Sequence, residues 1–205
     1  MYQGGDLEDV DFTDFASGVN QTGDFDVSAY FAHVDVGYKM DKWKFTYTGW
    51  YHSGDGNDQD GDFESFLQTD IDVPGSVVIL GSGQALADDD VFTERSQILD
   101  KGYIMNRLSA GYQATEKLYL EAAAMYMLTA EDIEYVDDNA VSQSNDEIGF
   151  EIDLLGKYQL YKNLELALQF GYLFADDAMD VFEVTRDGSS DEDLYLIESW
   201  LRFKF

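Results

Sequence analysis

Seven stretches of the chain alternate between apolar and polar residues. They lie at about 27–40, 42–52, 102–113, 117–129, 147–160, 164–174 and 194–205. Alternation with a period of two is typical of a β-strand whose two faces meet different surroundings. In the clearest case, the even-numbered residues from Ile148 to Leu154 are all apolar, and Glu151 and Asp153 lie between them. The pattern therefore predicts an all-β, antiparallel fold.

The connections between these stretches alternate in length. Short ones lie near 40–42, 114–117 and 161–163, whereas long ones cover about 53–101, 130–146 and 175–193. Short turns on one rim and long loops on the other are typical of transmembrane β-barrels, with the short turns on the periplasmic side. A soluble sandwich or lipocalin-like barrel could alternate in the same way, but it would not need an apolar, aromatic outward face in every strand. We therefore predict an antiparallel transmembrane β-barrel.

The composition is compatible with this prediction. The 205 residues suffice for one domain, 1–205, and the mean hydropathy of -0.32 would also suit a soluble protein. The sequence contains no run of about 18 apolar residues, so it predicts no transmembrane helix. In a transmembrane strand, however, only every second residue faces lipid, so the average hydropathy stays low. Aromatic residues make up 15% of the chain, and tyrosine and tryptophan suit the girdles at membrane–water interfaces.

The charge is strongly negative and unevenly distributed. The net charge is -30, from 42 acidic and 12 basic residues, so nucleic acid is excluded as a partner and cations should be attracted. The absence of cysteine excludes disulfides and thiolate metal sites. Acidic residues crowd the long connections. Eight basic residues lie at or near the short turns: Lys39, Lys42, Lys44, Lys117, Lys157, Lys162, Arg202 and Lys204.

The last predicted strand ends in an aromatic residue at the C-terminus. Phe203 and Phe205 continue its apolar face. Such a strand resembles the C-terminal assembly signal of Gram-negative outer-membrane β-barrels. The resemblance implies an outer-membrane location, with outer-membrane lipid and the barrel assembly machinery as partners. No secretory signal peptide is visible in residues 1–23, so we expect a mature piece or a fragment.

The predicted topology is incomplete. The C-terminus lies on the short-turn rim, and counting back seven strands puts residues 1–26 on the other rim, as an extracellular loop. Single-chain bacterial barrels have an even number of strands. We therefore predict that the chain forms the C-terminal seven strands of a larger barrel, or that another chain supplies the missing part.

One segment resembles a known family of porins. The aromatic strand Trp43–His52 leads into Ser53-Gly54-Asp55, then into an acidic Gly-rich stretch and the Phe-containing segment 62–66. This order is similar to the alginate-export porin family. Membership would imply a large monomeric barrel of roughly 16–18 strands around an aqueous channel. The alginate-binding lumen of that family is basic, whereas this chain is acidic, which argues against alginate as the solute.

Polar residues on the inward face of the strands are expected to line the lumen. Paired carboxylates can perform acid–base chemistry, but a polar wall with salt bridges explains these residues more simply. His33 and His52, the only histidines, both face inward near opposite ends of adjacent strands, so neither a metal site nor a proton relay is favoured. The predicted lining residues are His33, Asp35, Lys44, Arg107, Glu121, Glu151, Asp153, Lys157, Glu165, Glu198 and Arg202.

An acidic segment after the second predicted strand could bind Ca²⁺, which prefers several oxygen ligands. The segment does not keep the EF-hand frame, because aligning Gly61 to the loop glycine puts Leu67 at the twelfth position. A solvated acidic loop is the simpler interpretation. The candidate ligands are Asp55, Asn57, Asp58, Asp60, Asp62 and Glu64.

These features favour a passive channel over an enzyme. No Ser-His-Asp spacing, P-loop or nucleotide fingerprint is present. An acidic mouth would make the channel prefer cations. Two alternatives stay open. The barrel could be the sheath of a porin–cytochrome electron conduit, or an outer-membrane enzyme such as a lipase or protease, which would need a nucleophile–base pair at the rim.

Overall fold

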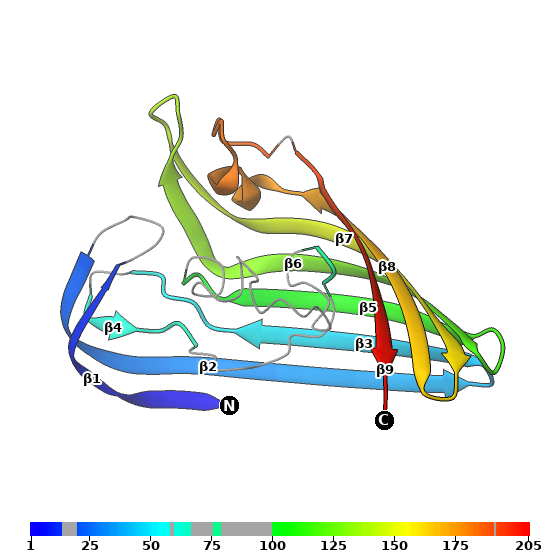
Figure 1. Ribbon diagram of the computed structural model, residues 1–205. Helices are drawn as coiled ribbons and strands as arrows, with labels where there is room; N and C mark the ends of the chain where they lie inside the picture. Colours follow the sequence, from blue (N-terminus) through cyan, green and yellow to red (C-terminus); the bar gives the residue numbers. More distant parts are fainter. Residues whose placement is uncertain (14–19, 58–59, 67–75, 79–99, 191) are drawn as a thin grey trace.

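The computed structural model describes residues 1–13, 20–57, 60–66, 76–78, 100–190 and 192–205. The described part is a single antiparallel sheet (Figure 1), with strand order β1-β2-β3-β5-β6-β7-β8-β9. The short β4 pairs in parallel with β2. The strands are β1 (Tyr2–Thr13), β2 (Asn20–Met40), β3 (Trp43–His52), β4 (Asp62–Phe63), β5 (Tyr103–Gln113), β6 (Leu118–Val136), β7 (Ser142–Tyr161), β8 (Leu164–Ala175) and β9 (Leu194–Phe203).

The seven strands predicted from alternation are present as β2, β3 and β5 to β9. Tight turns join β2 to β3, β5 to β6 and β7 to β8. In the first of them Asp41 has a positive φ of 51°, which suits the two-residue turns that join twisted antiparallel strands. A 3₁₀ helix, η1 (Asp177–Phe182), lies in the connection between β8 and β9. In the described part of the chain, no helix is long and apolar enough to span a membrane.

The prediction that residues 1–26 form a loop is wrong, and so is the count of seven strands. β1 pairs with residues 20–30 of β2, while β3 pairs with residues 31–40, so the β1–β2 hairpin extends beyond the end of β3. The segment lacks a continuous apolar face and is held by main-chain pairing, which leaves no alternation to detect. Asp6 lies opposite Asp26. The hydrogen bond and the like charge of Asp6 raise the pKa of the Asp26 carboxyl.

The predicted long connection 130–146 is also wrong, because β6 continues to Val136 and β7 begins at Ser142. Only residues 137–141 form the turn. The alternation continues through this region with inverted polarity: Ile133 and Tyr135 are buried, whereas Asp132 and Glu134 are exposed. A search for an apolar outward face therefore loses the strand after residue 129.

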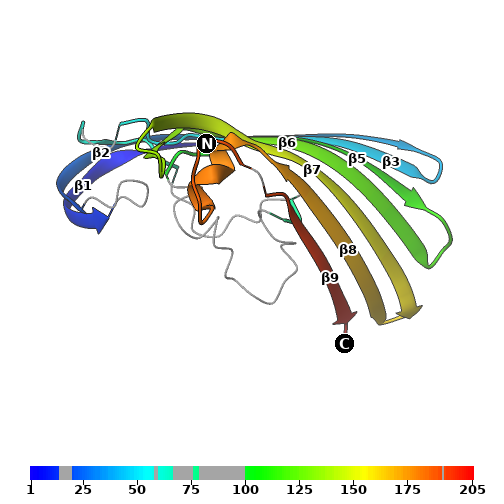
Figure 2. The same cartoon turned by 90° about the horizontal axis from the view of Figure 1, so that it is seen from above.

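The sheet is curved and open. Viewed from above, it forms an arc, with η1 on the concave side (Figure 2). One end of the strand order is β1 and β2, and the other is β9. A buried apolar cluster lies on the same side as η1, near the end of the strands that carries the long connections. It includes Trp50, Tyr103, Met105, Met125, Met127, Ile148, Leu173, Ala178 and Met179.

Candidate functional site

The pairing register collects the predicted lining residues on one face of the sheet. Residues opposite each other in neighbouring antiparallel strands share a face. One row runs Asp35–Thr48–Arg107–Met125–Glu151–Leu173 across β2 to β8. Another runs Lys44–Gly111–Glu121–Leu155–Gln169–Glu198 across β3 to β9. His33, Asp153, Lys157, Glu165 and Arg202 lie in rows above and below on that same face.

Polar side chains on this concave face bond to one another. Arg107 Nη2 donates to Glu121 Oε1 at 2.8 Å, and the Tyr119 hydroxyl donates to Glu121 Oε2 at 2.6 Å. Further along the wall, Gln169 Nε2 donates to Glu198 Oε2 at 2.8 Å. Charge-assisted bonds of this kind are shorter and stronger than neutral ones. The concave face therefore carries two groups of bonded polar side chains beside the buried apolar cluster, whereas the convex face exposes large apolar side chains.

Glu151 binds a segment of the long connection between β3 and β5. Ser76 Oγ donates to Glu151 Oε2 at 2.8 Å, and the main-chain N–H groups of Val77 and Val78 donate to Oε1 at 2.7 and 3.0 Å. Glu151 is 0% exposed, and three donors are what a buried carboxylate requires. We call this contact the Glu151 latch. It fixes residues 76–78 to the concave face of β7.

A small-residue niche supports the Glu151 latch. Asp153 lies two residues further along β7 on the same face and is 4% exposed. Its neighbours across the two adjacent strands are Ala123 and Gly171. A Cβ added at Gly171 would come within 2.7 Å of Val77 Cβ and 2.8 Å of Asp153 Oδ1. The missing side chain at Gly171 thus makes room for both residues. Sequence reasoning singled out Glu151 and Asp153, but it missed Ser76–Val78 because no local pattern marks that segment.

The Ser53-Gly54-Asp55 motif fastens both ends of the same long connection. Asp55 N donates to Asp100 O at 2.7 Å, and Lys101 Nζ donates to Asp55 O at 2.7 Å. Ser53 Oγ donates to Glu64 O at 2.6 Å. Gly54 lies against the main chain of Lys101, where a Cβ would overlap the carbonyl carbon. The motif therefore has a structural role in closing the base of the connection.

We expect Gly54→Ala to destabilise the protein by about 3 kcal/mol, since overpacking against the main chain cannot be relieved by a rotamer change. Gly56→Ala is the control, because its Cβ would meet only the flexible carboxylate of Glu131. Urea unfolding of the micelle-refolded protein measures both variants. Equal unfolding midpoints for the two variants would show that the Gly54 contact does not matter.

The two histidines do not form a pair. His33 lies opposite Trp50 and His52 opposite Phe31, so both are near the same end of β3. The prediction that they lie near opposite ends is wrong, because the two-residue turn at 41–42 pairs Met40 with Trp43 and this register brings residues 31–33 level with residues 50–52. His33 Nε2 lies 3.1 Å from Asp35 Oδ2, whereas His52 is 2% exposed.

The acidic segment proposed for Ca²⁺ uses its oxygens to hold its own turns. Asp55 Oδ1 accepts a hydrogen bond from Asn57 N, and Asp60 Oδ1 accepts one from Asp62 N, both at 3.0 Å. Burial, followed by neighbouring acids, raises the pKa of Glu64. Asp58 lies outside the described residues. Among those described, no group of three or more acidic or histidine side chains is placed to hold a metal ion, so calcium binding stays a prediction.

The turn between β6 and β7 is built around Asp137. Its Oδ1 accepts hydrogen bonds from Val141 N at 2.8 Å and Asn139 N at 2.9 Å, and its Oδ2 accepts one from Gln143 Nε2 at 2.9 Å. The Val141 N–H is the main cause of a lowered pKa at Asp137, with Gln143 next. A lowered pKa means that the carboxylate stabilises the folded turn above its ordinary pKa of 3.8 and that this stability is lost as pH falls through the lowered value.

We therefore expect the Asn139 and Val141 amides to lose protection from hydrogen exchange as pH falls below 3.8, the ordinary pKa of the carboxyl, after correction for intrinsic rates. In Asp137→Asn, which does not titrate, protection should be weaker at pH 5 and should not change with pH. A pH-dependent loss of the same size in the variant would assign the effect to other groups.

No protein-family model matches the sequence, and no curated protein matches it.

Proposed function

We propose that this chain forms part of the wall of an outer-membrane β-barrel that acts as a passive channel with a preference for cations. The observation that carries the proposal is the contrast between the two faces of one sheet. The convex face exposes large apolar side chains, such as Leu108 (65%) and Leu154 (50%). The concave face carries the bonded polar residues described above. An antiparallel sheet with lipid on one side and water on the other requires this division.

The strand lengths support a membrane span. β3, β5 and β9 have 10, 11 and 10 residues, and a tilted transmembrane strand needs about 9–11. β2, β6 and β7 are longer, with 21, 19 and 20 residues. Their extra length lies at the end that carries the long connections, which corresponds to the extracellular side in outer-membrane barrels.

The open edges support completion by further strands. Among the residues that the structure describes, no strand pairs with residues 32–40 of β2 on the side away from β3, since β1 pairs only with residues 20–30. β2 and β9 run in the same direction, since five antiparallel strands separate them in the order. Unpaired main-chain groups cannot face hydrocarbon. An odd number of additional strands, from the same polypeptide or from another chain, would close the barrel with every neighbour antiparallel.

The charge distribution supports selection of cations. Acidic side chains cluster at the long-connection end, including Asp137, Asp180 and Glu64, while eight of the 12 basic residues lie near the short turns. Like charges around a mouth raise the local concentration of counter-ions. The Glu151 latch brings part of the chain itself onto the concave face. This favours a solute channel over a sheath that holds a cytochrome.

The test is planar-bilayer conductance combined with an absorbance spectrum of the protein purified from its native membrane. We expect stepwise conductance and no haem band. A haem band without conductance would overturn the channel in favour of the electron-conduit sheath. A protein that stays in the aqueous fraction of lysed cells would overturn the membrane assignment itself.

A further inference from the structure

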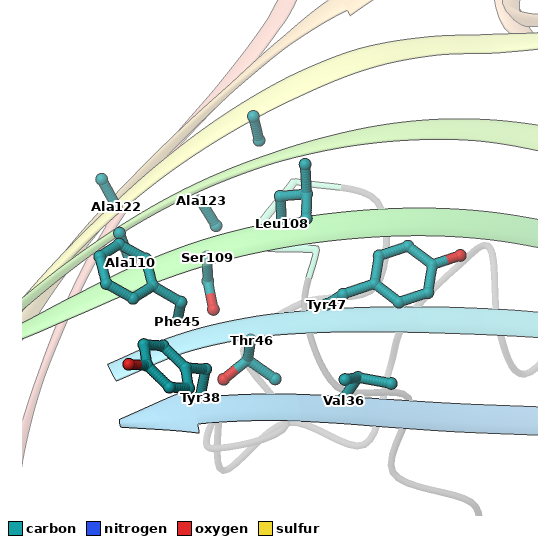
Figure 3. Close-up of a pocket in the computed structure, with 11 residues that line it drawn as sticks. Val36, Tyr38, Phe45, Thr46, Tyr47, Leu108, Ser109, Ala110, Ala122 and Ala123 are labelled. Carbon is teal, nitrogen blue, oxygen red and sulfur yellow. The ribbon is translucent and has the colours of Figure 1, made fainter. Parts of the chain in front are cut away.

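A shallow apolar trough crosses the convex face of β2, β3, β5 and β6, with a volume of about 540 Å³. Figure 3 shows Phe45, Tyr47 and Leu108 around it, with Ala110 and Ala122 in its floor. Two cross-strand rows border it, Val36–Tyr47–Leu108–Ala124 and Tyr38–Phe45–Ala110–Ala122. Residues of the opposite face, such as Ser109, can reach it only with their main chain, because strand side chains alternate.

The trough exists because small side chains replace large ones at consecutive cross-strand positions. Ala110 lies opposite Ala122, and the outward neighbours in the next strands are Phe45 and Leu154. Large side chains therefore stand on both sides of an alanine floor. A hollow with few partner atoms forfeits dispersion contacts. On a lipid-facing surface, the group available to restore those contacts is a hydrocarbon chain.

The trough lies close to the short-turn rim. From the trough toward this rim, aromatic residues come first and charged residues next, which is the order expected at a membrane–water interface. Trp43 and Tyr112 pack together with ring centroids 4.6 Å apart, and Trp43 stacks on Phe45 at 5.9 Å. Tryptophan and tyrosine at this level mark the boundary between hydrocarbon and headgroups. The trough therefore opens toward the layer where lipid headgroups lie.

The two turns beyond this aromatic layer carry charges of both signs. Asp41 and Lys42 form the β2–β3 turn, and Glu116 and Lys117 lie in the β5–β6 turn. The β2–β3 turn lies beside the end of β5, since Gln113 N donates to Lys42 O at 2.9 Å. Paired acids and lysines are complementary to a headgroup that carries both a phosphate and an ammonium group.

We propose that the trough binds one acyl chain of a zwitterionic glycerophospholipid with a primary ammonium headgroup, of the phosphatidylethanolamine type. Its phosphate pairs with Lys42 and Lys117, and its ammonium pairs with Asp41 and Glu116. This assignment rests on the proposed membrane location. It does not depend on which solute passes through the channel.

Native mass spectrometry of the full-length protein extracted from membranes tests the proposal, with phosphatidylethanolamine and phosphatidylglycerol added as competing probes. We expect one retained phosphatidylethanolamine, a loss of at least tenfold in retention for Ala122→Leu, and normal retention for Ala32→Leu, a matched alanine on the convex face outside the trough. Double replacement of Lys42 and Lys117 by alanine should remove the preference between the two headgroups.

Equal retention in Ala122→Leu and the wild type would overturn the trough as the binding site. Equal retention of the two lipids by the wild type would overturn the headgroup assignment. Conductance of the same samples separates this proposal from the proposed function. Normal conductance without specific lipid retention would contradict only the lipid site. Specific lipid retention without conductance would contradict only the channel.

Discussion

Leu154→Arg and Leu166→Arg will strongly impair assembly into the membrane. Both side chains lie on the convex face, where Leu154 is opposite Ala122 and Leu166 is opposite Leu201. An arginine facing lipid near the bilayer midplane of a β-barrel costs on the order of 2–4 kcal/mol, which is a large part of the stability of a typical domain, and the cost falls toward the interfaces. The effect should therefore be larger for Leu154 than for Leu166, which is the third residue of β8. Heat-modifiable migration on gels reports the folded fraction, and we expect it to fall at least tenfold.

Gln159→Arg and Gln169→Arg are the matched controls on the concave face. Gln169 already donates a hydrogen bond to Glu198, so a positive charge there meets a carboxylate. Both variants should fold like the wild type. Equal folding of all four arginine variants would contradict the assignment of the two faces and would favour a soluble β-protein.

The sheet could be predicted wherever one face must be apolar. From Phe150 to Leu154 the alternation is strict, and β7 follows it with the apolar residues on the exposed convex face. The prediction that Ile148 also faces outward is wrong, because the register shifts next to Gly149 and Ile148 is buried in the cluster on the concave side. The prediction failed in the parts of the chain where the outward face of a strand does not have to be apolar. The sequence of β1 and of residues 20–26 shows no continuous alternation of apolar and polar residues, and in residues 130–136 the buried side chains lie on the other face. Beyond the level of β3, strand formation depends on main-chain pairing, which leaves a weak signature in the side chains.

Glu151→Ala will release residues 76–78 from the concave face. Three hydrogen bonds to a buried carboxylate are lost, and bonds to charged groups contribute about 1.5–3 kcal/mol each. The chain contains no cysteine, so a single Val77→Cys reports accessibility without background. In the Glu151→Ala background we expect its labelling by a membrane-impermeant maleimide to accelerate at least tenfold.

Glu165→Ala is the control for this experiment. Glu165 lies on the same face of the neighbouring strand β8, opposite Gln159 and Arg202, well away from Ser76–Val78 along the strands. Labelling of Val77→Cys should be unchanged by it, and both glutamate variants should keep the gel migration of a folded protein. Unchanged labelling in Glu151→Ala would mean that the Glu151 latch does not hold the segment.

Only part of the candidate site could be predicted from the sequence. Some of its residues lie on one face of the strands, whereas their partners lie in a connection that is distant in the sequence. Period-two spacing assigns Glu151, Asp153 and Arg107 to one face, since strand geometry fixes which way they point. The partners of Glu151 lie about 75 residues away in the chain, and such a contact depends on how a long connection folds back. The latch therefore became visible only with the register and the hydrogen bonds.

The reversal potential of the complete protein under a KCl gradient tests the central claim most directly. The acidic long-connection end should make the pore prefer K⁺ over Cl⁻, and the preference should weaken as salt rises, because screening shortens the reach of the field from roughly 30 Å at 0.01 M to about 3 Å at 1 M. A cation-selective potential that declines with mean salt is the predicted result. An anion-selective potential, or a membrane that stays electrically silent, would contradict it.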